Sequence, residues 1–240
     1  MVTNLYYNKQ PTGGAQPATT DRVAVTDRTM LGRLPERGSH ERGLVDEILD
    51  EGLVAHVGLA TERGPIVLPM VYGRRDRDLF LHGAPASKFV RRAKHGVPVC
   101  VTVTLVDGLV LARSTFHHSI NYRSVVVLGE AVEVRDLDER AAALEAIVDH
   151  VAPGRSGEAR PANEQEVRGT TVLRLPIDEA SAKVRTGPPK DDDEDLELPI
   201  WAGVVPVSTV FGEPVGDGIG LPVPVAPSAA SYARPRVAAV

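Results

Sequence analysis

Cysteine, aromatic residues and long apolar runs are all scarce in this sequence of 240 residues. The single cysteine, Cys100, excludes an internal disulfide, and only 4% of the residues are aromatic. No run of about 18 apolar residues occurs, so we expect no transmembrane helix. The N-terminal stretch lacks the apolar region of a secretory signal. A cytoplasmic protein without membrane contact is the simplest prediction.

Several signatures of catalysis and binding are missing as well. The sequence has no cysteine cluster and no His-x-x-x-His pair, which argues against catalysis by a protein-bound metal. It has no Gly-x-Ser-x-Gly, so a serine hydrolase is not indicated, and neither the P-loop nor the dinucleotide glycine pattern is present. The net charge of -5 gives no electrostatic reason to expect a nucleic-acid partner.

The composition is otherwise that of an ordinary globular protein, with 42% hydrophobic and 25% charged residues. Residues 1–26 contain a Gly-Gly pair and show no periodicity, which predicts a disordered tail. Residues 213–240 are rich in Pro, Gly and Ala and predict a second disordered tail. A single domain is therefore expected over residues 27–212.

Hydrophobic patterning predicts a mainly β protein with a few helices. Short alternating runs predict strands over residues 54–60, 66–72, 79–82, 97–106, 109–112, 124–134, 170–175 and 181–185. Pro69 implies an edge position or a bulge, and Asp107-Gly108 predicts a type I′ hairpin. Helices are expected from an N-cap at Ser39 to Gly52, over residues 84–95, after an N-cap at Asp136, and over residues 162–169.

The densest group of polar side chains lies between two predicted strands, at residues 113–124. It contains neither Gly nor Pro, so it is no plain hairpin turn. It is either a solvated loop tip or one wall of a ligand site. His117 and His118 are adjacent, so at most one readily faces a given pocket. Arg113 and Arg123 either hold a phosphate or pair with surface carboxylates.

Two further stretches carry residues that suit an anion. At residues 79–92 a strand leads into a helix start, where Ser87 and Lys88 could reach a phosphate. At residues 181–187 alternation places Lys183 and Arg185 on one strand face, toward either a shared anion or solvent. Trp201 is either core packing or a stacking surface. The acidic stretch at 186–198 matches no calcium loop and is interpreted as a solvated loop.

Seven motifs in order resemble the pyridoxamine-5′-phosphate-oxidase-like flavin-binding split barrels, in particular the branch of flavin-nucleotide-binding proteins. The motifs are R-L-P-E-R-G (33–38), I-L-D-E-G (48–52), V-A-H-V-G (54–58), L-F-L-H-G-A-P-A-S-K (79–88), G-L-V-L-A-R-S-T-F-H-H-S-I-N-Y-R-S-V-V-V-L-G (108–129), S-A-K-V-R-T-G-P-P-K (181–190) and W-A-G-V-V-P (201–206). The resemblance implies a mainly β (α+β) fold, a six-stranded antiparallel split β-barrel with flanking helices. It also implies a homodimer that holds FMN or FAD at the subunit interface.

The resemblance assigns residues to the phosphate end of the flavin, to its isoalloxazine ring and to the rest of the binding cleft. The phosphate end would be bound by His82, Gly83, Ser87 and Lys88. The isoalloxazine would lie along the strand of Pro69, Met70, Val71 and Tyr72. The cleft would be completed by Trp201, Lys183 and Arg185, with Thr102, Asn121, Tyr122, Arg123 and Ser124 as further cofactor-binding candidates.

The nitroimidazole-reductase relatives carry the segment His-x-x-x-aromatic-x-Ser-Val, which His118, Tyr122, Ser124 and Val125 match here. In those relatives the His faces the flavin ring, so His118 is the predicted catalytic residue. The function expected is a flavin-dependent oxidoreductase that acts on a small planar or nitro-aromatic substrate. The alternative is a non-catalytic flavin or haem protein for storage, delivery, sensing or haem degradation, with His117 or His118 as the haem ligand.

Overall fold

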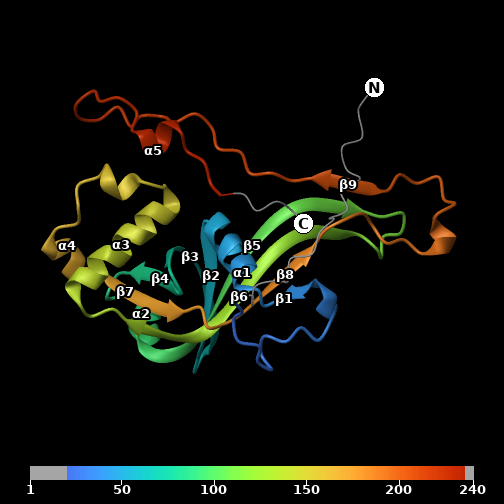
Figure 1. Ribbon diagram of the computed structural model, residues 1–240, viewed down its shortest axis with the longest axis horizontal. Coiled ribbons are helices and arrows are strands. Elements are labelled where there is room, and N and C mark those ends of the chain that lie inside the picture. The colour runs from blue at the N-terminus through green and yellow to red at the C-terminus, as the bar shows by residue number, and fades with distance from the viewer. Residues whose placement is uncertain (1–20, 236–240) are drawn as a thin grey trace, which may run out of the picture.

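The computed structural model describes residues 21–235, so residues 1–20 and 236–240 of the two predicted tails lie outside the described part. The described chain forms one antiparallel sheet with short helices around it (Figure 1). Its strands are β1 Gly38–Ser39, β2 Val54–Thr61, β3 Gly64–Arg75, β4 Asp78–Gly83, β5 His95–Leu111, β6 Ser119–Glu133, β7 Thr171–Pro176, β8 Glu179–Arg185 and β9 Gly203–Pro206. Its helices are α1 Arg42–Glu51, α2 Lys88–Ala93, α3 Leu137–Val151, α4 Glu164–Arg168 and α5 Pro227–Ala230, with 3-10 turns η1 Pro35–Arg37, η2 Arg155–Gly157 and η3 Asp193–Asp195.

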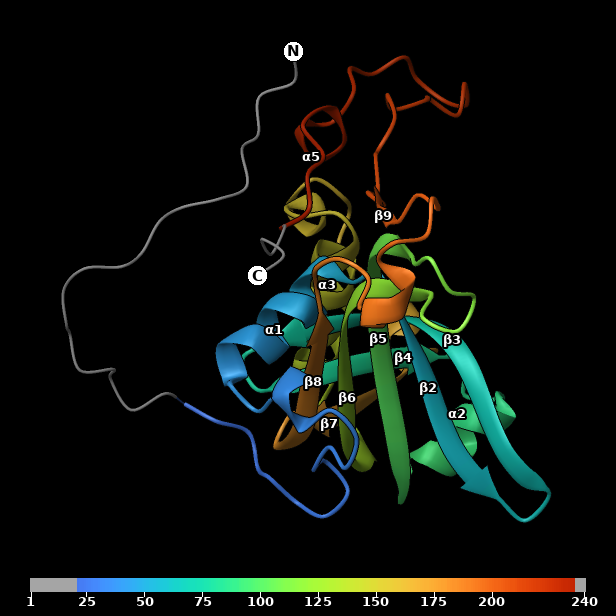
Figure 2. The same ribbon diagram turned by 90° about the vertical axis from the view of Figure 1, so that its right-hand side faces the viewer.

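Six of these strands close into a ring. The hydrogen-bonded order is β2–β3–β4–β7–β6–β5, and β5 pairs back with β2. The two longest strands, β5 and β6, extend beyond the ring, where they also pair with β9 and β8 (Figure 2). This ring with its two projecting strands confirms the predicted split β-barrel.

Alternating side chains divide the barrel into an apolar interior and an outer face. On β5, Val99, Val101 and Val103 are almost fully buried in the main core. The alternate residues Cys100, Thr102 and Thr104 project to the other side, as period-2 alternation requires. The core is therefore built largely from β-branched residues, which suit a pleated surface.

Two helices cover the barrel. Helix α1 adds Val45, Ile48 and Leu49 to the interior core. Helix α3 lies on the opposite, outer side of β3, β4 and β7, where its Ile147 packs with Phe80 in a second cluster. The helix backbone approaches Gly73 so closely that a Cβ there would lie 2.7 Å from the backbone nitrogen of Ile147.

The hairpin predicted at Asp107-Gly108 is wrong. Strand β5 runs straight through both residues, with only a register shift between Val106 and Gly108. Gly108 is needed for close packing, because a Cβ there would lie 2.8 Å from the side chain of Val204 on β9. Asp107 is held by an ion pair with Arg123. The chain reverses instead in the polar stretch that follows β5.

The helix boundaries differ from the predictions in two places. The N-cap residue of α1 is Glu41 and not the predicted Ser39. The Ser39 hydroxyl instead accepts a hydrogen bond from the backbone N–H of Glu41, just before the helix begins. Helix α2 begins only at Lys88, because the preceding residues form a turn closed by the Ser87 N–H and the Ala84 carbonyl. The predicted cap at Asp136 is confirmed, since its carboxylate accepts from the Glu139 N–H at 2.8 Å.

The segment after β9 runs back across the molecule to α3 (Figure 1). Tyr232 donates to the carbonyl of Val151 at 2.6 Å, and the Phe211 and Tyr232 rings lie 4.7 Å apart. The domain boundaries near residues 26 and 213 remain predictions. Within residues 21–235 no helix is both long enough and apolar enough to cross a membrane.

Candidate functional site

A continuous outer face runs over five neighbouring strands and collects many of the predicted residues. Strand pairing places His56 of β2 directly opposite both Pro69 of β3 and Thr102 of β5. Thr102 in turn pairs with Val126 of β6. Residues directly opposite in a sheet project to the same side, so Pro69, His56 and Thr102 form one row.

A second row lies beside the first. Thr104 of β5 pairs with Ser124 of β6, which pairs with Lys183 of β8. Tyr122 and Arg185 pair one step further along β6 and β8. The predicted candidates Ser124, Tyr122, Lys183 and Arg185 therefore share a face with Thr102, although they come from distant parts of the sequence.

The predicted phosphate group lies where β4 leads into α2. His82 is half-buried, and its Nδ1 is buried with no hydrogen-bond partner among residues 21–235. Burial lowers the pKa of His82, so the ring is neutral at pH 7. Gly83 lies against Val90 of α2, and Ser87 immediately precedes the helix. An unpartnered buried ring nitrogen calls for a ligand atom or a water.

Two of the predicted cofactor-binding side chains serve the fold instead. Tyr72 is fully buried, and its hydroxyl donates to the carbonyls of Leu49 and Gly52 in the α1 end. Arg123 is 4% exposed and is paired with Glu51 and Asp107. Both side chains are therefore engaged in contacts within the fold.

Asn121 and Arg185 form a buried pair that shapes the next loop. The Arg185 guanidinium donates to the Asn121 side-chain oxygen and, at 3.3 Å, to the carbonyls of Gly187 and Pro188. The Asn121 amide donates to the Gly187 carbonyl at 3.2 Å. Desolvation lowers the pKa of Arg185. These contacts hold the backbone of residues 187 and 188. Both side chains therefore support the loop next to the outer face.

The polar stretch forms the tip that joins β5 to β6. Arg113 pairs with Asp191 at 2.8 Å, and His117 lies 3.1 Å from Asp192, so both predicted anion or metal ligands already contact the acidic loop. His118 is exposed, and its Nδ1 lies 2.9 Å from the Ser114 carbonyl. Trp201 is 66% exposed, with its ring against Gly203. Of these groups, the His118 Nε2 and the Trp201 ring remain open to a partner or ligand.

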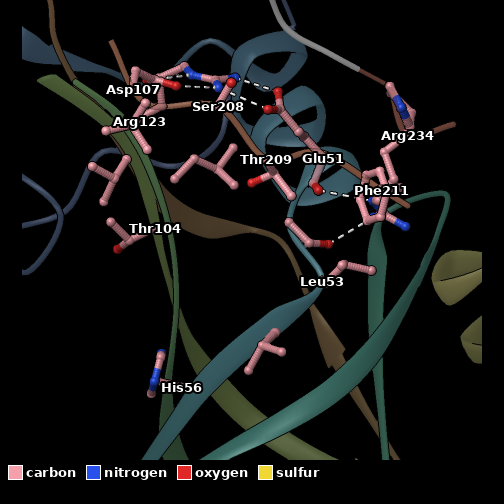
Figure 3. A pocket seen from close by; sticks show the side chains of 16 residues that line it. Glu51, Leu53, His56, Thr104, Asp107, Arg123, Ser208, Thr209, Phe211 and Arg234 are labelled. Carbon is pink, nitrogen blue, oxygen red and sulfur yellow. Dashed lines mark hydrogen bonds and ion pairs between the residues drawn. The ribbon is translucent and has the colours of Figure 1, made fainter. Parts of the chain in front are cut away.

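Sequence reasoning missed a cavity of about 430 Å³ at one end of the barrel. Figure 3 shows His56 at one end of this cavity and the Glu51–Arg123–Asp107 group at the other. Strand alternation could have revealed His56, because Ala55 and Val57 on either side of it are buried. The C-terminal residues that line the cavity, such as Phe211 and Arg234, give no such signal.

Comparison with known protein families identifies the chain. The model of the pyridoxamine 5′-phosphate oxidase family matches residues 41–184, which span β2 to β8. This chain belongs to that family. The matched region contains the strands of the closed ring and, apart from Arg185, the residues of both rows of the outer face.

Two solved structures of the same fold resemble this family member over most of its length. The flavocytochrome Anf3 from Azotobacter vinelandii is 38% identical, with a TM-score of 0.80, over 85% of this chain and 95% of its own. The FAD and heme binding protein from Mycobacterium smegmatis is 35% identical, with a TM-score of 0.76, over 80% of this chain and 95% of its own. No curated protein sequence gives a significant match.

Proposed function

We propose that this protein binds a flavin nucleotide and haem, and that it acts as a flavin-dependent oxidoreductase. The observation that carries the proposal is the likeness to two relatives, a flavocytochrome and an FAD and heme binding protein, each above 30% identity over most of the chain. The second relative favours FAD over FMN as the flavin. A bound flavin would supply the electron chemistry, while the protein binds, orients and shields it.

The outer face fits the flavin part of this proposal. Pro69 of β3 and Thr102 of β5 offer a strand surface for a planar ring. The unpartnered Nδ1 of His82, with Ser87 and Lys88 close in sequence, offers donors for phosphate oxygens. The catalytic role of His118 and a small planar or nitro-aromatic substrate remain predictions from the sequence.

An absorbance spectrum of the protein purified from cells tests the cofactors directly. Bound flavin would give peaks near ~370 and ~450 nm, and haem a sharp peak near ~410 nm. Chromatography of the released flavin then distinguishes FAD from FMN. A colourless protein that also takes up neither added FAD nor hemin contradicts the proposal.

Replacing Lys88 with alanine is expected to weaken FAD binding about 10- to 100-fold, because a hydrogen bond to a charged group contributes roughly 1.5–3 kcal/mol. The measurement is a titration of flavin-free protein with FAD. Arg168→Ala is the matched control, since Arg168 forms an exposed pair with Glu164 on α4, outside the site. Equal affinities for the two variants would remove Lys88 from the phosphate site.

We further propose that the protein is a homodimer with the flavin at the interface. The outer face and its extension carry apolar side chains that are 37–60% exposed, namely Val67, Val71, Leu109, Ile120 and Val205. Such a concentration of exposed apolar side chains is typical of an interaction surface. A second copy of the chain would bury them.

Sedimentation of the flavin-loaded protein at micromolar concentration tests this state. The wild type should sediment as a dimer, whereas Val67→Asp should sediment as a monomer and lose flavin, because a buried carboxylate without a partner opposes association. Leu221→Asp is the control, since Leu221 is 84% exposed in the C-terminal segment. A monomeric wild type that retains flavin would contradict the proposal.

A further inference from the structure

The cavity at the end of the barrel joins two parts of the chain that are far apart in sequence. One wall comes from β2 and β5, with Val54, His56 and Val106. The other comes from the segment after β9, with Val207 and Phe211 (Figure 3). Its volume of about 430 Å³ is in the range of cofactor and ligand pockets. The apolar walls favour a largely apolar molecule.

His56 is the one imidazole that lines this cavity, and it is unpartnered. Within residues 21–235 neither of its ring nitrogens makes a hydrogen bond, and its side chain is exposed on the outer face. The two imidazoles predicted as haem ligands differ from it. His117 contacts Asp192 and His118 contacts Ser114. His56 is therefore the imidazole with both nitrogens free beside apolar walls.

We infer that His56 would hold haem iron and that the cavity would receive part of the macrocycle, an inference that rests on the haem half of the proposed function. A neutral imidazole is a common haem ligand. The inference replaces His117 and His118 in that role. It also places haem beside the strand of Pro69, and that strand is predicted from the sequence to lie along the flavin ring.

The polar end of the cavity suits the two carboxylates that haem carries. Arg234 donates to the backbone carbonyls of Glu51 at 3.0 Å and Gly52 at 2.8 Å, and forms no ion pair with a carboxylate among residues 21–235. It also donates to the backbone carbonyls of Asp50 and His150, so backbone groups occupy most of its N–H donors while no carboxylate of the described residues balances its charge. Arg123 at the same end is already balanced, because two carboxylates pair with it.

The experiment is a titration of haem-free protein with hemin, followed by absorbance, for the wild type, His56→Ala, His117→Ala and His118→Ala. Flavin absorbance near ~450 nm serves as an internal reference. His56→Ala should bind hemin at least about tenfold more weakly, with a shifted Soret band that added imidazole restores. Its flavin content should not change. The other two variants should bind hemin as the wild type does.

Each other outcome has a distinct meaning. If His56→Ala keeps the wild-type Soret band, the inference is overturned, and loss of that band in His118→Ala would move the ligand to the tip between β5 and β6. If His56→Ala loses flavin as well as haem while its circular dichroism is unchanged, His56 belongs to the flavin surface and the inference is again overturned. A wild type that binds flavin but no hemin overturns the haem half of the proposed function itself.

Discussion

Replacing Arg123 with alanine is expected to lower the free energy of unfolding by about 3–5 kcal/mol, because it removes a buried guanidinium and leaves two partly buried carboxylates without their counter-charge. The guanidinium is 4% exposed and lies between two acidic groups. It donates to Asp107 at 2.7 and 2.9 Å and to Glu51 at 2.9 Å. Both partners raise the pKa of Arg123, with Asp107 first, so it stays charged throughout the accessible pH range.

Chemical denaturation of the cofactor-free protein measures this effect. Arg160→Ala is the matched control, because Arg160 pairs with Glu166 on an exposed surface. Exposed pairs contribute about 1 kcal/mol or less, so the control should unfold close to the wild type. Similar losses in the two variants would mean that Arg123 contributes no more than a surface ion pair. Since Arg123 ties β6 to β5 and to the end of α1, the larger loss is expected.

Lowering the pH from about 6.5 to about 4 is expected to destabilise the protein through His150. Burial, with the charge of Arg234 as the second cause, lowers the pKa of His150 from 6.5 to about 4. The unfolded chain therefore binds a proton in this window that the folded chain excludes, and stability falls as the pH falls. The largest loss from this one group is about 3 kcal/mol, and it is complete only below the folded pKa. Above about pH 6.5 the group makes no difference.

The measurement compares the pH dependence of unfolding in the wild type and in His150→Gln. The glutamine amide can still donate to the Gly52 carbonyl, which lies 2.8 Å from His150 Nε2, but it does not titrate. The variant should lose part of the acid destabilisation, while His118→Gln, at an exposed position, should keep it. Parallel pH profiles for the wild type and His150→Gln would show that folding does not change the protonation of His150, which contradicts the prediction.

His150 and Arg234 also connect stability to the site. Both contact the carbonyl of Gly52, and both lie close to the buried Tyr72, whose ring is 4.3 Å from that of His150. Arg234 also lines the cavity in which we place haem. The docking of the C-terminal segment thus affects the pKa of His150 and one wall of the cavity together.

Local patterns in the sequence determined much of the fold. Period-2 alternation identified the strands and the buried positions Val99, Val101 and Val103. Capping chemistry located the start of α3 at Asp136 and the end of α1 at Gly52. The ordered motifs determined the family, and with it the split barrel. These features depend on neighbours within a few residues, or on a whole set of motifs, and so are readable from the chain itself.

Only the tertiary structure decided which polar groups meet. Arg123 had two possible roles in the sequence, and the structure shows the carboxylate pairing, with Glu51, which is 72 positions away. The hairpin signal at Asp107-Gly108 was overridden because β9 and Arg123 hold that part of β5 extended. His56 became a candidate ligand only when the segment around Phe211 was placed over it as a cavity wall. Strand alternation gives the side to which a residue projects, whereas the partner found there depends on contacts between distant segments, which no local pattern encodes.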